Sequence, residues 1–545
     1  MEKTIYSIVI IVVFSIISGF SLLQKGLHPT HDGEYHVVRF YEFDKVLRSG
    51  VLYPRWAPDL NYGYGVPLFN YVYPLPNYVA SLFHFFGTSF IDAFKLQMFF
   101  ASIIGGIFFY LWAKHFWGEI GGVVSAIFYI FSPYRFVDIY VRGSVGEVWA
   151  LAFFPAFLWS INNFFYKKDK IFILYSSLFL AAIIFSHNIL ALMFLFFAVF
   201  YIVFLICQSK DKIYFMLNTL YLILLGIGLS SIFWLPALLE KQYATGLQIY
   251  DIRENFPQIF QLLFPSWGSG FSASDLQNQM SFQIGIGNLL AVLLAIVAGL
   301  ILFKKRDIHR FFVAYFLVWF AFVFFLMLNV SLPIWKHIPL MNYFQFPWRL
   351  LSLEIIITSF LAGSLIYVWK SKILAAFMVM MVFLLGIGYT KPAYYHQRDD
   401  NYYIMRSNFI DGTNSPGNVF NTIWFNRNLR KQKDKITLKN NSAEIKTQSL
   451  TATSYIFNIA VREATEAIIN TAYFPGWTVF ANNKKLDTKP NKDGIITFSI
   501  PKGEHLVEVR FLKTTLQKIA TTVSLISLLV ILTLFTKKNY VKIKR

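Results

Sequence analysis

Hydrophobic residues along this chain are grouped in blocks of about 20, the length of a helix that crosses a lipid bilayer. The first block covers Ile5 to Leu23, and polar or basic connections separate most later blocks. The stretch from Leu68 to Phe86 is also apolar, but it contains Pro74 and Pro76, which favour a re-entrant or interfacial helix. The pattern predicts about twelve spans, at residues 5–23, 94–112, 118–132, 147–165, 171–187, 189–207, 213–235, 286–303, 309–329, 349–369, 373–389 and 514–535.

A long polar segment, residues 391–512, precedes the last span. Near its end apolar and polar residues alternate, and turn signals such as Pro475-Gly476 and Asp493-Gly494 separate the alternating runs. Short strands at this spacing are typical of an antiparallel β-sandwich. We predict strands at 467–470, 477–480, 495–500 and 505–510.

The predicted fold class is therefore mostly α, a polytopic transmembrane helix bundle with a C-terminal β-sandwich domain. The predicted parts are a transmembrane module at 1–390 with a large first loop at 25–93, a β-sandwich at 391–512, and a last span with a basic tail at 513–545.

Composition supports this organisation. Hydrophobic residues make up 56% of the chain and charged residues 14%, against about 25% charged in a typical soluble domain. An ordinary soluble enzyme is thereby excluded. The single cysteine, Cys207, excludes an intrachain disulfide.

The net charge of +20 is distributed by topology. If the N-terminus is cytoplasmic, the short basic connections fall on the cytoplasmic side, as the positive-inside rule requires. We therefore predict a multi-pass protein of the cytoplasmic membrane with both termini cytoplasmic and the β-domain extracytoplasmic. Membrane lipids are expected partners and nucleic acid is not. The basic connections are 167–170, 210–212, 304–310, 370–372 and the tail from Lys537.

The first outer loop begins with His31-Asp32-Gly33-Glu34-Tyr35-His36, just after the first span. Asp32 and Glu34 place two carboxylates, candidate functional residues, at the membrane edge. Asp32 is alternatively an N-cap for a helix that starts near Gly33. The two histidines have no metal-ligand spacing and are consistent with interfacial residues.

The second outer loop, residues 132–147, concentrates Arg135, Asp138, Arg142 and Glu147. Ionisable groups beside hydrocarbon are costly and mark functional sites. The spacing predicts an i,i+3 pair between Arg135 and Asp138. It predicts that Arg142 and Glu147 face neighbouring spans rather than each other.

Both loops are predicted at the same membrane face. A carboxylate that takes a proton from an acceptor hydroxyl, with arginines that hold a leaving phosphate, suits glycosyl transfer from a lipid phosphate. The site would lie at the interface, since the donor's tail is in the bilayer and its sugar is in water.

Several motifs resemble a known family. The acidic motif after the first span, the run Pro133-Tyr134 to Arg142-Gly143 and the C-terminal extracytoplasmic domain look like the GT-C superfamily of polytopic glycosyltransferases. The phrase Tyr473-Phe474-Pro475-Gly476-Trp477 is similar to the end of YfhO-type membrane glycosyltransferases. The runs 344–349 and 186–188 resemble a bacterial group labelled 6-pyruvoyl-tetrahydropterin synthase-related membrane proteins.

The resemblance implies a polyprenyl-phosphate-linked sugar donor, an inverting transfer and a glycan, lipid or protein acceptor. It implies Asp32 as the catalytic base with Glu34 as the neighbouring candidate. Asp138 and Glu147 then position the acceptor or a metal, and Arg142, Arg349 and His187 bind the donor phosphate. The second loop lacks an Asp-x-Asp pattern, so no cofactor is assigned and a divalent metal is left open. For His187, a structural place in the helix turn with Asn188 is equally consistent.

Two other classes of function fit the sequence. A transporter or flippase of lipid-linked glycans places ionisable groups near the bilayer midplane, and Glu354 is the one acid deep within a predicted span, where it needs a partner or a proton. A non-catalytic glycan-binding scaffold would use basic residues of the β-domain, Lys484, Lys485, Lys489, Lys492 and Lys502. Flux of a lipid-linked glycan without sugar transfer would favour the transporter. Glycan binding by the β-domain, together with full function when Asp32 is replaced, would favour the scaffold.

Overall fold

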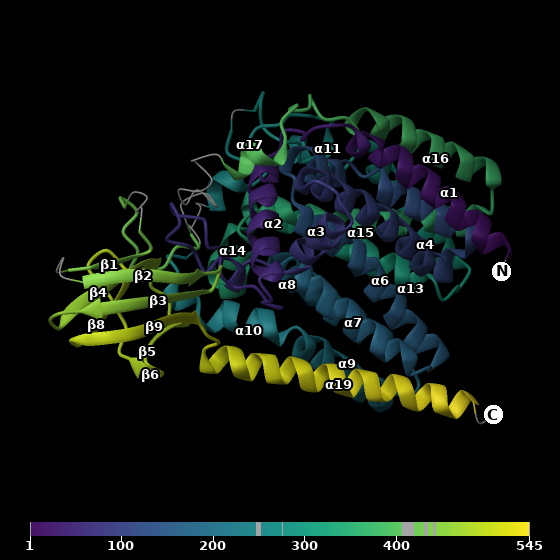
Figure 1. Ribbon diagram of the computed structural model, residues 1–545. Coiled ribbons are helices and arrows are strands. Elements are labelled where there is room, and N and C mark those ends of the chain that lie inside the picture. The colour runs from purple at the N-terminus through teal and green to yellow at the C-terminus, as the bar shows by residue number, and fades with distance from the viewer. Residues whose placement is uncertain are drawn as a thin grey trace.

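The computed structural model describes residues 2–246, 252–274, 276–405, 419–429, 434–439 and 443–543. A helix bundle makes up most of it, and a β-domain lies at one end, opposite both chain termini (Figure 1). We call this the β-domain end of the bundle. The long helices are α1 (Glu2–Gly19), α4 (Phe90–Ile130), α6 (Val145–Lys167), α7 (Ile171–Ser186), α8 (Asn188–Gln208), α9 (Lys212–Leu229), α12 (Ile286–Lys304), α13 (Arg310–Met327), α15 (Leu351–Trp369), α16 (Lys372–Gly386) and α19 (Thr515–Ile543).

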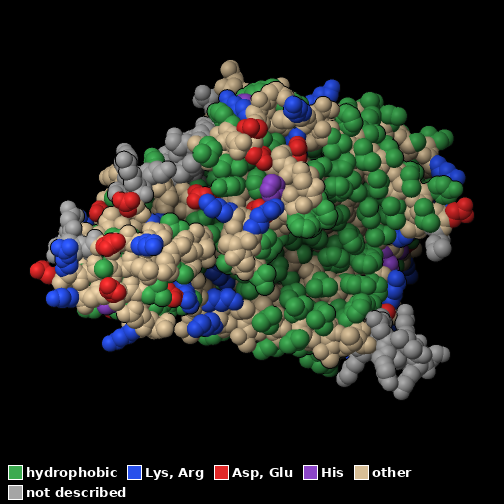
Figure 2. All heavy atoms as spheres, in the orientation of Figure 1, with side chains coloured by type: hydrophobic (Ala, Val, Ile, Leu, Met, Phe, Trp, Pro, Cys, Tyr) green, Lys and Arg blue, Asp and Glu red, His purple; other side chains and the backbone are tan. Residues whose placement is uncertain are grey.

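Within the described residues, 10 helices are long and apolar enough to cross a membrane, and α7 is an apolar helix of shorter length. Their outer faces carry exposed large hydrophobic residues, for example Leu293, Val318 and Phe377. Figure 2 shows this apolar surface over the helical part of the molecule and most charges elsewhere. The predicted fold class, mostly helical with a C-terminal β-domain, is confirmed. The number of spans, the membrane side of each end and the domain boundaries stay predictions, and the tail residues 544–545 lie outside the described part.

The predicted spans 94–112 and 118–132 both lie in α4, which reverses direction within its length. Gly118 has a φ of 73°, a conformation that glycine adopts without the steric cost of a Cβ. Beyond it the chain folds back, so that the Phe109 and Tyr129 rings stack with their centroids 4.7 Å apart. The two predictions are thus two arms of one hairpin.

Short helices gather at the β-domain end. Helix α2 (Gly33–Arg48) runs across the ends of the long helices there (Figure 1). The apolar stretch 68–86 forms a 3₁₀ turn, Leu68–Asn70, followed by α3 (Leu75–Phe85). At 11 residues α3 is too short to span a bilayer, in keeping with an interfacial helix. The remaining short helices are α5 (Pro133–Phe136), α10 (Ser231–Leu239), α11 (Ile259–Leu263), α14 (Leu332–His337) and α17 (Asp400–Ile404).

The β-domain consists of two antiparallel sheets, ordered β1-β4-β8-β7 and β2-β3-β9-β5-β6. Alternate residues such as Phe457, Val479 and Val507 point into a shared apolar core. The four predicted strands are confirmed as β4, β5, β8 and β9. The strands are β1 (Ile436–Leu438), β2 (Ala443–Leu450), β3 (Ser454–Val461), β4 (Thr465–Ala472), β5 (Trp477–Ala481), β6 (Lys484–Leu486), β7 (Lys489–Pro490), β8 (Ile495–Ile500) and β9 (Gly503–Phe511).

The first loop is packed into this domain. The Trp56 ring lies 5.4 Å from that of Trp477, and the Ala472 N–H donates to the Tyr64 carbonyl at 2.8 Å. On the bundle side, the Glu240 carboxylate accepts hydrogen bonds from Asn70 at 2.9 Å, and from Gln517 at 2.9 Å and Thr514 at 2.5 Å at the start of α19. Since Glu240 follows α10, these contacts tie the first loop and the start of α19, which follows the β-domain, to the bundle.

Candidate active site at the β-domain end of the bundle

The two loops that the sequence marks as acidic meet through their backbones. The N–H groups of His31 and Asp32 donate to the carbonyls of Val141 and Arg142, each at 3.0 Å. Gly143 makes this approach possible. It has a φ of 65°, and a Cβ on it would lie 2.4 Å from Oγ1 of Thr30. Residues about a hundred positions apart are therefore held side by side.

Asp32 stands at the start of α2 but does not cap it. Its side chain makes no capping hydrogen bond, whereas Oγ1 of Thr30 accepts from the Gly33 N–H at 2.9 Å. The capping interpretation of Asp32 is wrong, because Thr30 fills that role. Among the described residues no hydrogen bond to the Asp32 carboxylate is found. Burial raises the pKa of Asp32, and the nearby positive charges of Arg142 and Arg39 oppose that rise.

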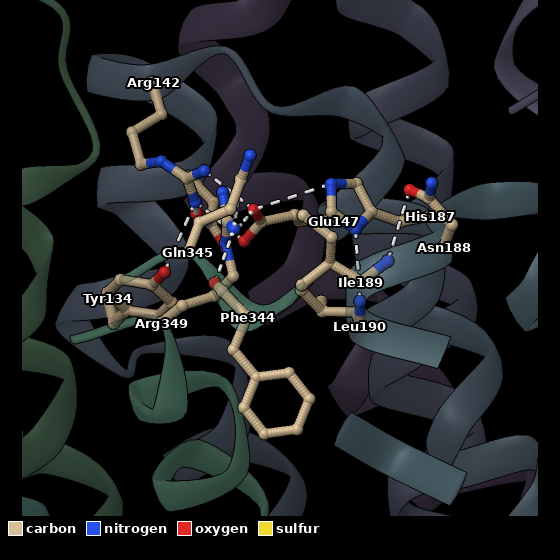
Figure 3. Close-up of polar contacts among 11 residues, drawn as sticks. Tyr134, Arg142, Glu147, His187, Asn188, Ile189, Leu190, Phe344, Gln345 and Arg349 are labelled. Carbon is tan, nitrogen blue, oxygen red and sulfur yellow. Dashed lines mark hydrogen bonds and ion pairs between the residues drawn. The ribbon is translucent and has the colours of Figure 1, made fainter. Parts of the chain in front are cut away.

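Arg142 lies between two buried carboxylates, those of Asp138 and Glu147, and Figure 3 shows its contact with Glu147. Its Nη1 and Nη2 each lie 2.7 Å from a different oxygen of Glu147, and Nη1 also lies 2.5 Å from Oδ1 of Asp138. Our prediction that Arg142 and Glu147 face apart is therefore wrong. The reason is local: residues Val137–Arg142 form a π-helical turn, and the left-handed Gly143 then turns the chain back over the first turn of α6.

Arg349 completes the cluster from the other side of Glu147. Its Nε donates to Oε1 of Glu147 at 3.0 Å, and its Nη1 donates to the Phe344 carbonyl and to Oε1 of Gln345. Two arginines thus face two acids, Asp138 and Glu147. Buried charges of this kind need such pairing to offset their lost hydration.

His187 approaches Glu147 from the junction of α7 and α8. Its Nε2 lies 3.8 Å from Oε1 of Glu147, and its Nδ1 accepts from the Leu190 N–H at 3.2 Å, which caps α8. Because Nδ1 accepts this hydrogen bond, it carries no proton. His187 therefore has a structural role as the cap of α8, and its ring also lies next to the Arg142–Glu147–Arg349 cluster.

Arg135 does not pair with Asp138, contrary to the predicted i,i+3 contact, because Asp138 pairs with Arg142 instead. The Arg135 guanidinium donates to the carbonyls of Tyr129 and Ile130 and lies 4.5 Å from the centre of the Tyr129 ring. Its role is to tie the start of the second loop to α4.

Three aromatic residues of the site were missed from the sequence. The Tyr73 ring lies 5.0 Å from that of His187, and Nη1 of Arg142 donates to the Tyr134 hydroxyl at 3.3 Å. The Trp348 ring lies 4.9 Å from the Arg142 guanidinium. Tyr134 and Trp348 lie within the runs 133–143 and 344–349 that resemble the known family, and this was the available signal for them. Tyr73 has no such signal, and its ring lies 2.5 Å from where a Cβ on Gly146 would be.

Asp32, Asp138, Arg142, Glu147, His187 and Arg349 are thus brought to one place, and Glu34 is half-buried in the first turn of α2. In the part of the chain that the structure describes, no group of three or more His, Cys, Asp or Glu side chains is placed to hold a metal ion.

Comparison with known proteins adds a family. A family model described as "6-pyruvoyl-tetrahydropterin synthase related domain; membrane protein" matches residues 69–394. The chain belongs to this family. The membership predicted from the sequence motifs is confirmed, and the protein is a membrane protein. The part matched by this synthase-related membrane family includes Arg142, Glu147, His187 and Arg349, whereas Asp32 and the β-domain lie outside it.

This chain is similar to an uncharacterised protein from Lactococcus lactis subsp. cremoris (strain MG1363), with 24% identity over 238 residues. The match covers 42% of this chain and 39% of the relative, so the chain spans well under half of that protein's length.

Three solved structures are similar in part. The first is the Archaeoglobus fulgidus oligosaccharyltransferase in the apo form (10% identity, 72% of this chain and 56% of that chain, TM-score 0.43). The second is the arabinofuranosyltransferase AftD from mycobacteria (16% identity, 70% and 26%, TM-score 0.43). The third is ArnT from Cupriavidus metallidurans bound to undecaprenyl phosphate (11% identity, 91% and 98%, TM-score 0.34).

Proposed function

We propose that this chain is an integral-membrane glycosyltransferase of the GT-C type, which moves a sugar from a polyprenyl-phosphate donor to an acceptor hydroxyl on the outer face of the membrane. One observation carries the proposal. The Asp32 carboxylate takes no part in capping α2 and lies where the first loop meets a cluster of two buried arginines. A base beside fixed positive charge is the arrangement that this reaction needs.

In the proposed reaction Asp32 accepts the proton of the acceptor hydroxyl while the hydroxyl oxygen attacks the anomeric carbon of the donor sugar. The sugar–phosphate bond breaks on the opposite side, and the leaving polyprenyl phosphate gains negative charge. Attack from that side inverts the anomeric centre. Glu34, in the first turn of α2, is the neighbouring candidate for the base.

The arginines keep donors for that phosphate. No hydrogen bond within the described residues uses Nε of Arg142 or Nη2 of Arg349, and a guanidinium carries five N–H groups. In this proposal Asp138 and Glu147 hold both guanidinium groups in place, and the free donors and the His187 ring face the donor phosphate. Holding charge in advance lowers the cost of reorganisation during the reaction.

The proposed membrane placement follows from the basic connections, which lie at the opposite end of the predicted spans from Asp32. We place the β-domain and the site outside the cytoplasmic membrane and both termini inside. The acceptor is a glycan, a lipid or a protein that reaches this face.

A transfer assay tests the proposal. Purified protein in lipid nanodiscs is given polyprenyl-phosphate sugars with a membrane extract as the acceptor source, and the release of free polyprenyl phosphate is measured. The proposal predicts release that requires both the acceptor and the full chain. Absence of release with every donor sugar, under conditions where the protein is folded, contradicts it.

A transporter of lipid-linked glycans is the second candidate, and Glu354 favours it. This residue of α15 is 1% exposed, and neither carboxylate oxygen has a hydrogen-bond partner within the described residues. Burial without a partner favours the neutral acid, and such groups occur in proton-coupled transport. Flux of a lipid-linked glycan in proteoliposomes that stops in Glu354→Gln, without sugar transfer, would select this candidate.

A further inference from the structure

An uncharged loop lies next to the candidate site. We call residues 259–274 the flap. It begins with α11, contains no Asp, Glu, Lys or Arg, and exposes large apolar side chains. Phe264 is 65% exposed and Phe271 66% exposed. A group of exposed large apolar side chains in one loop is typical of an interaction surface. The exposed apolar residues are Ile259, Phe260, Phe264, Trp267 and Phe271.

The flap has a defined backbone conformation. The Gly270 N–H donates to the Asn278 carbonyl at 2.6 Å, and the Ile284 N–H donates to the Leu262 carbonyl at 3.0 Å. Gly268 packs so closely that a Cβ on it would lie 2.3 Å from the Gln279 carbonyl oxygen. The apolar side chains are therefore presented by an ordered loop.

The flap rests on the ends of two apolar helices. The Trp267 ring stacks 4.7 Å from Tyr389, just beyond α16. Pro265 and Tyr389 also help to line a small cavity between α12 and α16. Both helices expose apolar side chains along their length, such as Leu293 and Leu384. The exposed surface of the flap therefore continues the lipid-facing surface of the predicted spans.

The flap also touches the residue that precedes the proposed base. Nε2 of His31 lies 2.9 Å from the Ser269 carbonyl oxygen, and the His31 and Phe271 rings are 4.5 Å apart. One loop thus contacts both the apolar helix surface and the entrance to the site.

We infer that the flap is a membrane-inserted element. Its aromatic side chains enter the outer leaflet of the bilayer, and they hold the surface of that leaflet against the site at His31. Aromatic rings are preferred at this depth, where an apolar body and a polar edge are both satisfied. The insertion is shallow, because irregular backbone does not occur in lipid-exposed hydrocarbon. The contact between the flap and His31 would present a lipid-linked donor to Asp32, and this purpose rests on the proposed function.

Depth-dependent fluorescence quenching tests the insertion. Cys207 is the single cysteine, so Cys207→Ser gives a background in which Phe271→Cys is labelled with a nitrobenzoxadiazole probe. Lys485→Cys on β6, an exposed residue of the β-domain, is the control. The full-length variants are placed in phosphatidylcholine–phosphatidylglycerol nanodiscs that carry nitroxide lipids labelled near the headgroup or near the chain end.

The inference predicts a blue-shifted emission at position 271 that loses more of its intensity to the nitroxide near the headgroup than to the deep one. The control should emit as in water without quenching. Water-like, unquenched emission at 271 overturns the inference, and so does quenching by the deep nitroxide alone. If Phe271→Cys does not fold, Phe264→Cys provides the same measurement. The result does not depend on catalysis, so a failed Asp32 test and a failed insertion test are distinguishable.

Discussion

The two terminal nitrogens of Arg142 each lie 2.7 Å from a different carboxylate oxygen of Glu147. This forked pair joins the last residue of the π-helical turn to the first turn of α6 in a buried place, and it is the strongest geometry available to such a pair. Asp138 and Arg349 extend it on either side. The pair therefore fixes the second loop, against which Asp32 is held.

Removal of Arg142 should destabilise the fold strongly. Arg142→Ala leaves Asp138 and Glu147 buried without their main partner, which typically costs about 3–5 kcal/mol of unfolding free energy. Lys489→Ala is the control, since that lysine pairs with Asp487 and both side chains are exposed, so that loss of the pair costs about 0–1 kcal/mol. Thermal unfolding in detergent compares the two variants. Equal melting temperatures would argue against the buried fork as a source of stability.

Gly143→Ala should disrupt the contact between the two loops. The substitution adds the strain of a positive φ, about 1–3 kcal/mol, and a contact 2.4 Å from Thr30 Oγ1. Gly87→Ala separates these effects, because Gly87 also has a positive φ of 91° but no atom within 4 Å of a Cβ. We expect Gly143→Ala to lower stability and activity more than Gly87→Ala. Similar losses in both variants would mean that the Thr30 contact has no effect.

The sequence indicated some of these features and not others, for physical reasons. Strands β8 and β9 were predictable because their side chains alternate between the core and the surface, with Val507 and Val509 buried. The Arg142–Glu147 pair was not predictable from the sequence. Residues five apart on an α-helix are rotated by about 140° from each other, and the contact exists only because the π-turn and Gly143 change that angle.

The start of α2 was ambiguous from the sequence for a different reason. Thr30 and Asp32 are both residue types that cap helices, and residue preference alone does not tell which one does so. Only the position of Thr30 Oγ1, 2.9 Å from the Gly33 nitrogen, leaves the Asp32 carboxylate available.

The pH dependence of the reaction should report on Asp32. Burial raises its pKa above the ordinary value of 3.8, and the base acts only when deprotonated, so kcat/KM should rise with pH through that raised pKa. In the same window the folded state binds more protons than the unfolded state, so the unfolding free energy falls as pH rises. Asp32→Asn should lack this fall. If kcat/KM instead rises with pH around the pKa of a free aspartate, the expectation is contradicted.

Lys435 should make the β-domain contact pH-dependent in the opposite direction. Its Nζ donates to the carbonyls of Gly63 and Asn470, and burial lowers its pKa to about 7 from 10.5. Between these values the unfolded state holds the proton and the folded state does not, so stability rises with pH. Lys435→Met should remove part of that rise, whereas Lys439→Met, an exposed neighbour, should not. Unfolding temperatures from pH 7 to 10 measure this, and equal slopes in both variants would count against it.

The central claim is that Asp32 is the general base of sugar transfer. The most direct measurement compares wild type with Asp32→Asn in nanodiscs, by the acceptor-dependent release of polyprenyl phosphate, with Asp92→Asn as an exposed acid control near the same end of the bundle. Loss of a positioned base lowers the rate by about 10²–10⁴-fold. We predict that loss for Asp32→Asn, with the melting temperature preserved, and near wild-type release for Asp92→Asn. Full release by folded Asp32→Asn protein would contradict the account.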